Sequence, residues 1–170
     1  IDPSAYEVKQ LWFNSKDGTR VPMFVFHKKG IKLDGKNPTM LTGYGGFNVS
    51  LTPSFSGGRY LWLEHGGVFA VANLRGGSEF GEDWHRAGML TQKQNVFDDF
   101  AAALDYLAEA KYSRPDRTVL IGGSNGGLLM GAMITQHPDK MKAVVSGAGI
   151  YDMLRVELST NGEYNTTEFG

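Results

Sequence analysis

Alternating apolar and polar positions near the start of the chain predict a β-hairpin. Apolar residues alternate loosely from Tyr6 to Phe13, and the residues from Val21 to His27 again favour a strand. The segment between them, residues 14–18, combines Asn, Ser, Lys, Asp and Gly, which is typical of a turn. We therefore expect two antiparallel strands at the beginning of the fold.

After the hairpin, short apolar runs alternate with segments that favour helix. The runs that we expect to form buried strands are Pro38–Tyr44, Val68–Ala72, Thr118–Ile121 and Ala143–Ser146. The segments that we expect to form helices are Arg59–Glu64, Asn95–Ala110 and Asn125–Gln136. This alternation predicts an α/β fold with six strands in a mainly parallel sheet. No linker or internal repeat divides the chain, so residues 1–170 are expected to form one domain or part of one.

The clearest of the expected helices, over residues 95–110, has an apolar stripe and a polar side. The stripe recurs at three- and four-residue spacing, at Phe97, Phe100, Leu104 and Leu107. Three carboxylates, Asp98, Asp99 and Asp105, take the other side. Packing against a core explains the stripe without any functional role.

The composition favours a globular domain and excludes several classes of partner. Hydrophobic residues make up 41% of the chain and aromatic residues 12%, which is enough to bury one core. Because the net charge is −1 and Lys and Arg are scattered, we expect no nucleic-acid or anionic-membrane partner. No run approaches the roughly 20 apolar residues of a membrane span.

Neither a metal nor another cofactor is expected. The chain has no cysteine, which excludes disulfides and thiolate zinc sites. The histidines lie on separate expected elements without HxxxH or HExxH spacing: His27, His65, His85 and His137. Both ends look like cuts, since the chain does not begin with Met and residues 166–170 show neither a helix cap nor a closing strand. The cellular compartment is not readable from these residues.

A glycine-rich segment, residues 122–127, places a GxSxG motif between an expected strand and an expected helix. That is the context of a nucleophile elbow, in which the serine occupies a strained turn and its hydroxyl points away from the sheet. Small neighbours let the strand and helix pass closely, which the four glycines of the segment allow. Ser124 is therefore the candidate nucleophile, and the N–H of Asn125, at the start of the helix, is a candidate donor to an oxyanion.

The same glycines allow a turn that only packs closely or one that cradles a phosphate. The segment GGSNGG lacks both GxGxxG and the lysine of a phosphate-binding loop, so the nucleophile is favoured. A hydrolase of this kind takes its second oxyanion donor from the loop after its third strand. Here that loop is Gly43-Tyr44-Gly45-Gly46-Phe47.

Five segments together resemble the prolyl oligopeptidase family of serine peptidases, and the resemblance runs over essentially all 170 residues. They are residues 15–19 (SKDGT), 44–47 (YGGF), 72–77 (ANLRGG), 97–100 (FDDF) and 122–127 (GGSNGG). The resemblance implies an α/β-hydrolase fold of which about six of eight strands are present. It implies that Ser124 forms an acyl-enzyme and that the Tyr44 hydroxyl and the Asn125 N–H form the oxyanion hole. It also implies that Phe47 lines the pocket for the residue before the scissile bond, with Ile150 as an apolar wall.

The resemblance places the other two members of the catalytic triad outside this chain. His137 lies thirteen residues after Ser124, at the far end of the helix that begins at the elbow, so it is excluded as the base. Asp152 follows the sixth strand, whereas the family's acid follows the seventh and its histidine the eighth. Both would lie beyond Gly170, so the chain alone is expected to be inactive. The family's β-propeller, which admits only short peptides, would precede Ile1.

Two positions bear on substrate recognition. Family members that cleave after proline place a proline-stacking Trp about where this chain has Asn165, unless the alignment shifts between residues 159 and 167. Cleavage after proline is therefore the leading expectation, with a broader specificity as the alternative. Arg75 is interpreted as a structural ion pair in preference to a binder of a substrate carboxylate.

Two other functions remain open for these residues. One is an esterase-type α/β hydrolase, which would lack an upstream propeller. The other is a non-catalytic assembly fragment. Because the edge of the last strand would be exposed, we expect self-association of the chain through that edge.

Overall fold

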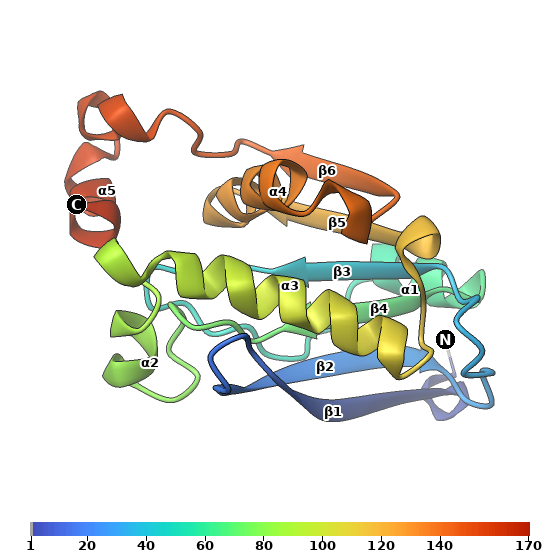
Figure 1. Ribbon diagram of the computed structural model, residues 1–170. Coiled ribbons are helices and arrows are strands. Elements are labelled where there is room, and N and C mark those ends of the chain that lie inside the picture. The colour runs from blue at the N-terminus through green and yellow to red at the C-terminus, as the bar shows by residue number, and fades with distance from the viewer. Residues whose placement is uncertain (1) are drawn as a thin grey trace.

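The computed structural model describes residues 2–170 and shows a six-stranded sheet with helices on both of its faces (Figure 1). The strands are β1 (Tyr6–Asn14), β2 (Arg20–Lys28), β3 (Thr39–Gly43), β4 (Val68–Ala72), β5 (Thr118–Gly123) and β6 (Ala143–Gly147). The α-helices are α1 (Gly57–Glu64), α2 (Glu82–Arg86), α3 (Gln94–Glu109), α4 (Asn125–Gln136) and α5 (Gly162–Phe169). The short 3₁₀ helices are η1 (Pro3–Ala5), η2 (Leu90–Gln92), η3 (Pro115–Arg117), η4 (Pro138–Lys140) and η5 (Met153–Leu158).

The strand order, β1-β2-β4-β3-β5-β6, joins an antiparallel hairpin to four parallel strands. β1 pairs with β2 so that Tyr6 lies opposite Lys28 and Asn14 opposite Arg20, and β2 is also antiparallel to β4. β4, β3, β5 and β6 run parallel to one another. The expected hairpin and the six-stranded, mainly parallel sheet are confirmed. The carboxyl ends of the four parallel strands meet at one edge, where open α/β sheets bind ligands.

The alternation of side chains along β4 shows how the two layers of helices are attached. Val68, Ala70 and Ala72 face the main core, which α3 and α4 cover. Phe69 and Val71 face a smaller cluster with Leu63 of α1, on the other side of the sheet (Figure 1). Successive side chains of a strand point to opposite faces, so a fully apolar strand needs cover on both. β4 is buried along its whole length, as its sequence predicts.

Residues 143–146 were expected to form a buried strand. The strand is confirmed, but its burial is wrong. β6 forms, but most of its residues are exposed, and the side chain of Val145 is 54% accessible to solvent. The physical reason is position: β6 is the last strand in the sheet, so it has a neighbour on one side only. The apolar run in the sequence predicts a strand, but it does not indicate whether other elements of the fold cover that strand.

Arg75 lies in a buried ion pair that joins three separate parts of the chain. Its guanidinium donates to both carboxylate oxygens of Asp99 in α3, with Nη2 2.6 Å from Oδ1 and Nε 3.0 Å from Oδ2. It also contacts Asp17 in the turn between β1 and β2, at 2.6 Å. Arg75 is 4% exposed and Asp99 fully buried. The structural role of Arg75 is confirmed, and the placement of Asp99 on a polar side away from the core is wrong, because its partner lies in a different element.

The contact with Arg75 makes the turn between β1 and β2 sensitive to acid. Hydrogen bonding to Arg75 lowers the pKa of Asp17 from 3.8 to about 2. Since the pKa of Asp17 is lower in the folded state than in the unfolded chain, its stabilising effect is present above about pH 4 and is lost as the pH falls to about 2. We expect Asp17→Asn to reduce the pH dependence of the unfolding free energy across that window. The effect is at most about 1 kcal/mol, because the side chain of Asp17 is 48% exposed.

Urea unfolding of the chain between about pH 2 and about pH 6 measures this effect. Asp139→Asn, at an exposed aspartate of η4, is the matched control and should keep the pH dependence of the parent chain. An Asp17→Asn curve parallel to that of the control would contradict the role of the ion pair.

The expectation that residues 166–170 show no helix cap is also wrong. α5 runs to Phe169, and Gly170 ends it with a φ of 100° and an N–H bond of 3.0 Å to the carbonyl of Thr166. Glycine is the residue that most readily takes this left-handed backbone after a helix. α2 was likewise not predicted. Both helices lie beside the beginning of α3 (Figure 1).

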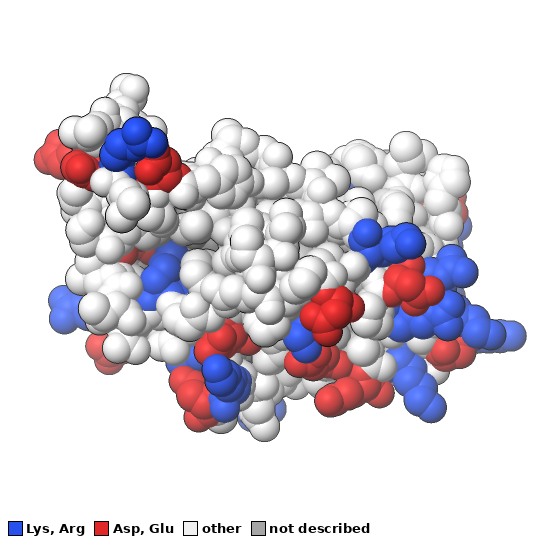
Figure 2. Space-filling model, turned by 45° about the horizontal axis from the view of Figure 1, so that its top comes forward, with Lys and Arg blue, Asp and Glu red and all other residues white. Residues whose placement is uncertain are grey.

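Charged residues are interspersed on the visible face, and the surface over α4 and β6 is largely uncharged (Figure 2). In the described part of the chain, no helix has both the length and the apolar character required to cross a bilayer.

Candidate active site

Ser124 occupies the sharp turn between β5 and α4. Its backbone has φ 57° and ψ −121°, in the left-handed half of the map, which non-glycine residues adopt only under strain. The turn is held by a 2.9 Å hydrogen bond from the N–H of Ser124 to the carbonyl of Gly147 after β6. The hydroxyl does not cap α4, and the residue is exposed. The strained, outward-facing serine that the motif predicts is therefore present.

The glycines around Ser124 are required by close backbone approaches at three of their four positions. A Cβ on Gly122 would lie 2.3 Å from the carbonyl oxygen of Gly126. A Cβ on Gly127 would lie 2.6 Å from Gly149 Cα. Gly126 is also tight, whereas a Cβ on Gly123 would meet its nearest neighbour at 3.4 Å, an ordinary contact. The steric requirement for glycine thus holds for the elbow but not at Gly123.

Tyr44 follows β3, which pairs in parallel with β5, so the Tyr44 loop and the elbow leave the sheet side by side. The side chain of Asn125 joins them: its Nδ2 donates to the carbonyl oxygen of Tyr44 at 2.5 Å. Within residues 2–170, no backbone carbonyl accepts from the N–H of Asn125, which belongs to the first turn of α4. Such first-turn N–H groups, with the positive end of the helix dipole, can stabilise a negative charge above the helix.

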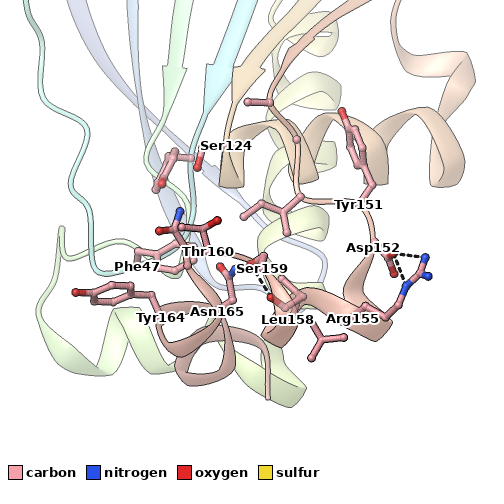
Figure 3. Close-up of a pocket in the computed structure, with 16 residues that line it drawn as sticks. Phe47, Ser124, Tyr151, Asp152, Arg155, Leu158, Ser159, Thr160, Tyr164 and Asn165 are labelled. Atoms are coloured by element: carbon pink, nitrogen blue, oxygen red, sulfur yellow. Dashed lines mark hydrogen bonds and ion pairs between the residues drawn. The ribbon is translucent and has the colours of Figure 1, made fainter.

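A cavity of about 870 Å³ opens beside Ser124. Four of the five candidate residues line it, namely Tyr44, Phe47, Ser124 and Ile150. Figure 3 shows Ser124 at one end of this cavity and Phe47 near Tyr164 and Asn165 at the other. The side chain of the fifth candidate, Asn125, is buried beneath the Tyr44 loop instead. The cavity is therefore placed to hold a substrate whose reacting carbonyl lies at Ser124.

Asn165 gives one wall of the cavity a polar character. Its side chain is 5% exposed, and Nδ2 lies 3.2 Å from the hydroxyl oxygen of Ser159 (Figure 3). Phe47 and Ile150 provide apolar surface in the same cavity. Phe47 is supported from behind by Phe169, whose ring meets it edge to face at a centroid distance of 5.6 Å. The cavity thus has apolar walls and one buried amide.

No base contacts the Ser124 hydroxyl within residues 2–170. The histidines are engaged elsewhere: His27 with Lys28, His65 with Leu61 and His85 with Glu168, while His137 ends α4. The first acid after β6 is Asp152, whose Oδ2 accepts a 2.8 Å hydrogen bond from Arg155 Nε. Dashed lines mark this pair in Figure 3. The described part of the chain also holds no group of three His, Cys, Asp or Glu side chains suited to a metal ion.

Sequence reasoning missed three charged or titratable residues behind the Tyr44 loop, namely Lys93, Glu168 and His85. Lys93 contacts both the carbonyl of Gly45 and the carboxylate of Glu168. These partners lie 48 and 75 residues away in the sequence, so no local pattern indicates the contacts. The only available signal was the apolar character of Phe169 next to Glu168, which is typical of a buried helix end.

Comparison with known proteins agrees with this geometry. The family model described as "Prolyl oligopeptidase family" matches residues 53–170. A prolyl endopeptidase of Elizabethkingia miricola is 49% identical over 99% of this chain, and one of Dictyostelium discoideum is 47% identical over 98%. The chain spans 24% and 22% of those relatives, about a quarter of their length.

Solved structures show the same likeness. A chain from a structural study of two prolyl endopeptidases is 52% identical and superposes with a TM-score of 0.98, covering 100% of this chain and 25% of its own length. A post-proline cleaving enzyme from Rickettsia typhi has a TM-score of 0.96 at 40% identity, with the same coverage. The six-stranded sheet is therefore that of the α/β-hydrolase domain of these enzymes, and the chain belongs to the prolyl oligopeptidase family.

Proposed function

We propose that this chain is the nucleophile-bearing part of a longer serine peptidase that hydrolyses short peptides through an acyl-enzyme on Ser124. The observation that carries the proposal is the left-handed turn at Ser124, which presents an uncapped, exposed hydroxyl to a cavity. Strain of this kind persists only where the surrounding structure imposes it, and it clusters at reactive sites. A turn that served packing alone would not need a serine in this conformation.

In the proposed reaction, Ser124 Oγ attacks the carbonyl carbon of the scissile bond while a base takes its proton. The carbonyl oxygen becomes an oxyanion, which accepts hydrogen bonds from the Tyr44 hydroxyl and the Asn125 N–H. The base returns the proton to the leaving amine, and the C–N bond breaks to give an acyl-enzyme. Water, activated by the same base, then attacks the acyl carbon and releases Ser124.

The base and its supporting acid are proposed to come from residues beyond Gly170. Support comes from the share of about a quarter that the chain covers in its relatives, and from the lack of a base at Ser124 in residues 2–170. The chain alone is then expected to turn over little substrate, because removal of the base leaves only the oxyanion hole and binding. A β-propeller upstream of Ile1 is proposed to restrict substrates to short peptides.

Cleavage after proline is the proposed preference, because the cavity offers apolar walls at Phe47 and Ile150 and the relatives are named prolyl endopeptidases. The buried amide of Asn165 in the same cavity supports tolerance of residues other than proline. The test is a panel of chromogenic peptides that differ only in the residue before the scissile bond, assayed with the full-length polypeptide. Hydrolysis of peptides with proline preferred supports the proposal. Turnover of small esters without turnover of any peptide would instead favour the esterase.

The exposed edge of the sheet at β6 is the proposed contact surface for the remainder of the domain. In the isolated chain, the same edge is proposed to contact a second copy. β6 forms the edge of the sheet, Val145 is 54% exposed, and Leu154 of η5 is 92% exposed. Exposed strand edges with apolar neighbours favour pairing between chains. In sedimentation velocity, the isolated chain should form dimers or larger species, and Val145→Lys should shift it toward monomer. A monodisperse monomer of the unaltered chain would contradict this expectation.

A further inference from the structure

A buried ion pair lies directly behind the loop that carries Tyr44 and Phe47. The ammonium of Lys93 is 3.0 Å from Glu168 Oε1, and the two side chains are 12% and 3% exposed. The second oxygen of Glu168 accepts from Nε2 of His85 at 3.0 Å. Buried charges are stabilised only when they are paired and hydrogen-bonded, which both carboxylate oxygens achieve here. Burial lowers the pKa of Lys93 relative to an exposed lysine.

This pair also contacts the loop itself. Lys93 Nζ donates to the carbonyl oxygen of Gly45 at 2.9 Å, next to the carbonyl of Tyr44 that Asn125 holds. A Cβ on Gly46 would lie 2.9 Å from Glu168 Oε1 and 2.6 Å from Asn125 Nδ2. The loop therefore packs closely between these two side chains at Gly46. Two successive carbonyls of the loop are therefore fixed by side chains that come from α4 and from the residue before α3.

The contact extends to the wall of the cavity. Lys93 Nζ lies 5.1 Å from the ring centroid of Phe169, and that ring packs edge to face against Phe47. Residues 168 and 169, at the end of α5, thus support the loop at Gly46 and at Phe47. Figure 1 shows the end of α5 next to the beginning of α3, where these residues meet.

The loop needs such support because its backbone is strained. Phe47 and Asn48 have φ angles of 53° and 57°, in the left-handed region that side chains disfavour, most strongly at a bulky residue such as Phe47. Only two backbone hydrogen bonds of the described chain start from this part of the loop, from the N–H of Asn48 to Gly76 and from the N–H of Val49 to Gly46. A strained segment keeps one conformation only when its surroundings impose it.

We propose that Lys93 and Glu168 are positioning residues, whose buried pair holds the Tyr44–Phe47 loop so that the Tyr44 hydroxyl reaches the oxyanion and Phe47 walls the pocket. The inference rests on the proposed role of Tyr44 in catalysis. Neither residue lines the cavity beside Ser124, so their effect on the reaction must pass through the loop.

The test is a double-mutant cycle in the full-length polypeptide with the peptide substrate that it cleaves best. Tyr44→Phe alone should lower kcat by about 100-fold, the usual effect of removing one oxyanion donor. Lys93→Met alone should lower kcat by about 10- to 100-fold and change KM by less than about 3-fold, because a small displacement of a catalytic group has effects of this size. In the Tyr44→Phe background, Lys93→Met should lower kcat by less than about 3-fold.

The matched control is Lys28→Met, which removes a lysine paired with Glu64 at the surface and should change kcat by less than about 2-fold. If Lys93→Met does not fold, Glu168→Gln replaces it, since glutamine keeps an oxygen for Lys93 and removes the charge. Equal losses of kcat in the two Tyr44 backgrounds, or wild-type kcat in a folded variant, would overturn the proposal.

A second readout does not depend on activity. In the chain itself, hydrogen exchange at the N–H groups of Asn48 and Val49 should become at least about tenfold faster in Lys93→Met than in Lys28→Met. Unchanged exchange at these two groups would overturn the role of the pair. If the full-length polypeptide cleaves no peptide, the proposed function fails, and the exchange experiment still decides whether the pair holds the loop.

Discussion

Replacing Ser124 by alanine in the full-length polypeptide should lower kcat for its best peptide by about five to six orders of magnitude. Losses of this size follow from removing the nucleophile of a serine peptidase, since only binding and oxyanion stabilisation remain. Alanine tolerates the position, because the hydroxyl of Ser124 makes no capping bond to α4. KM and the unfolding midpoint should therefore change little. Steady-state kinetics with the same peptide, beside urea unfolding, measures both quantities.

The control for this substitution is Ser78→Ala, which removes an exposed hydroxyl that bonds only to Ser50 in the described structure. It should leave kcat within about twofold of the parent. A Ser124→Ala protein that folds and keeps more than about a hundredth of the parent kcat would contradict the role of Ser124 as nucleophile.

Removing Arg75 should produce the largest change in stability. Arg75→Met keeps most of the side-chain volume but leaves the fully buried carboxylate of Asp99 without its cation. Breaking a buried ion pair by removing one partner reduces the free energy of unfolding by about 3–5 kcal/mol. This is a large fraction of the roughly 5–15 kcal/mol that stabilises a typical domain. Urea unfolding at neutral pH measures the change.

Arg86→Met is the comparison, because Arg86 pairs with Glu82 on the surface of α2 at 2.9 Å and is 71% exposed. We expect it to change the unfolding free energy by less than about 1 kcal/mol. Adding Asp99→Leu to Arg75→Met should recover part of the lost stability, since the unpaired charge is then gone. Equal effects of Arg75→Met and Arg86→Met would show that the buried pair does not hold the three elements together.

The local pattern of the sequence predicts the elements of this fold well where neighbours in the chain decide the structure. The uninterrupted apolar run of β4 predicts burial on both faces of the strand, and the apolar stripe of α3 predicts burial that repeats with the helical period. The pattern is wrong at Asp99, because its burial depends on Arg75, 24 residues away. It is wrong on the burial of β6, because cover on a strand is supplied by other elements and not by the strand itself.

The candidate site divides in the same way. The glycines predict Ser124 because the steric demand of the elbow is local, and the order of elements predicts the loop after β3, which is a neighbour of β5. The role of the Tyr44 hydroxyl was implied only by the family resemblance. The contacts of Lys93 with Gly45 and with Glu168 join residues 48 and 75 positions apart, so a short window of sequence cannot connect them. The family resemblance implied roles for Ser124, Tyr44 and Asn125, whereas the contacts of Lys93 behind the loop are visible only in the three-dimensional structure.

That Ser124 is the activated nucleophile can be tested by labelling the folded full-length polypeptide with a serine-directed fluorophosphonate and mapping the adduct by mass spectrometry. The expected result is a single stoichiometric adduct on Ser124, which is absent from the Ser124→Ala variant. The same reagent should label the isolated chain only slowly, because no base contacts Ser124 within residues 2–170. A folded full-length polypeptide that takes no adduct, or takes it at a different serine, would contradict the assignment.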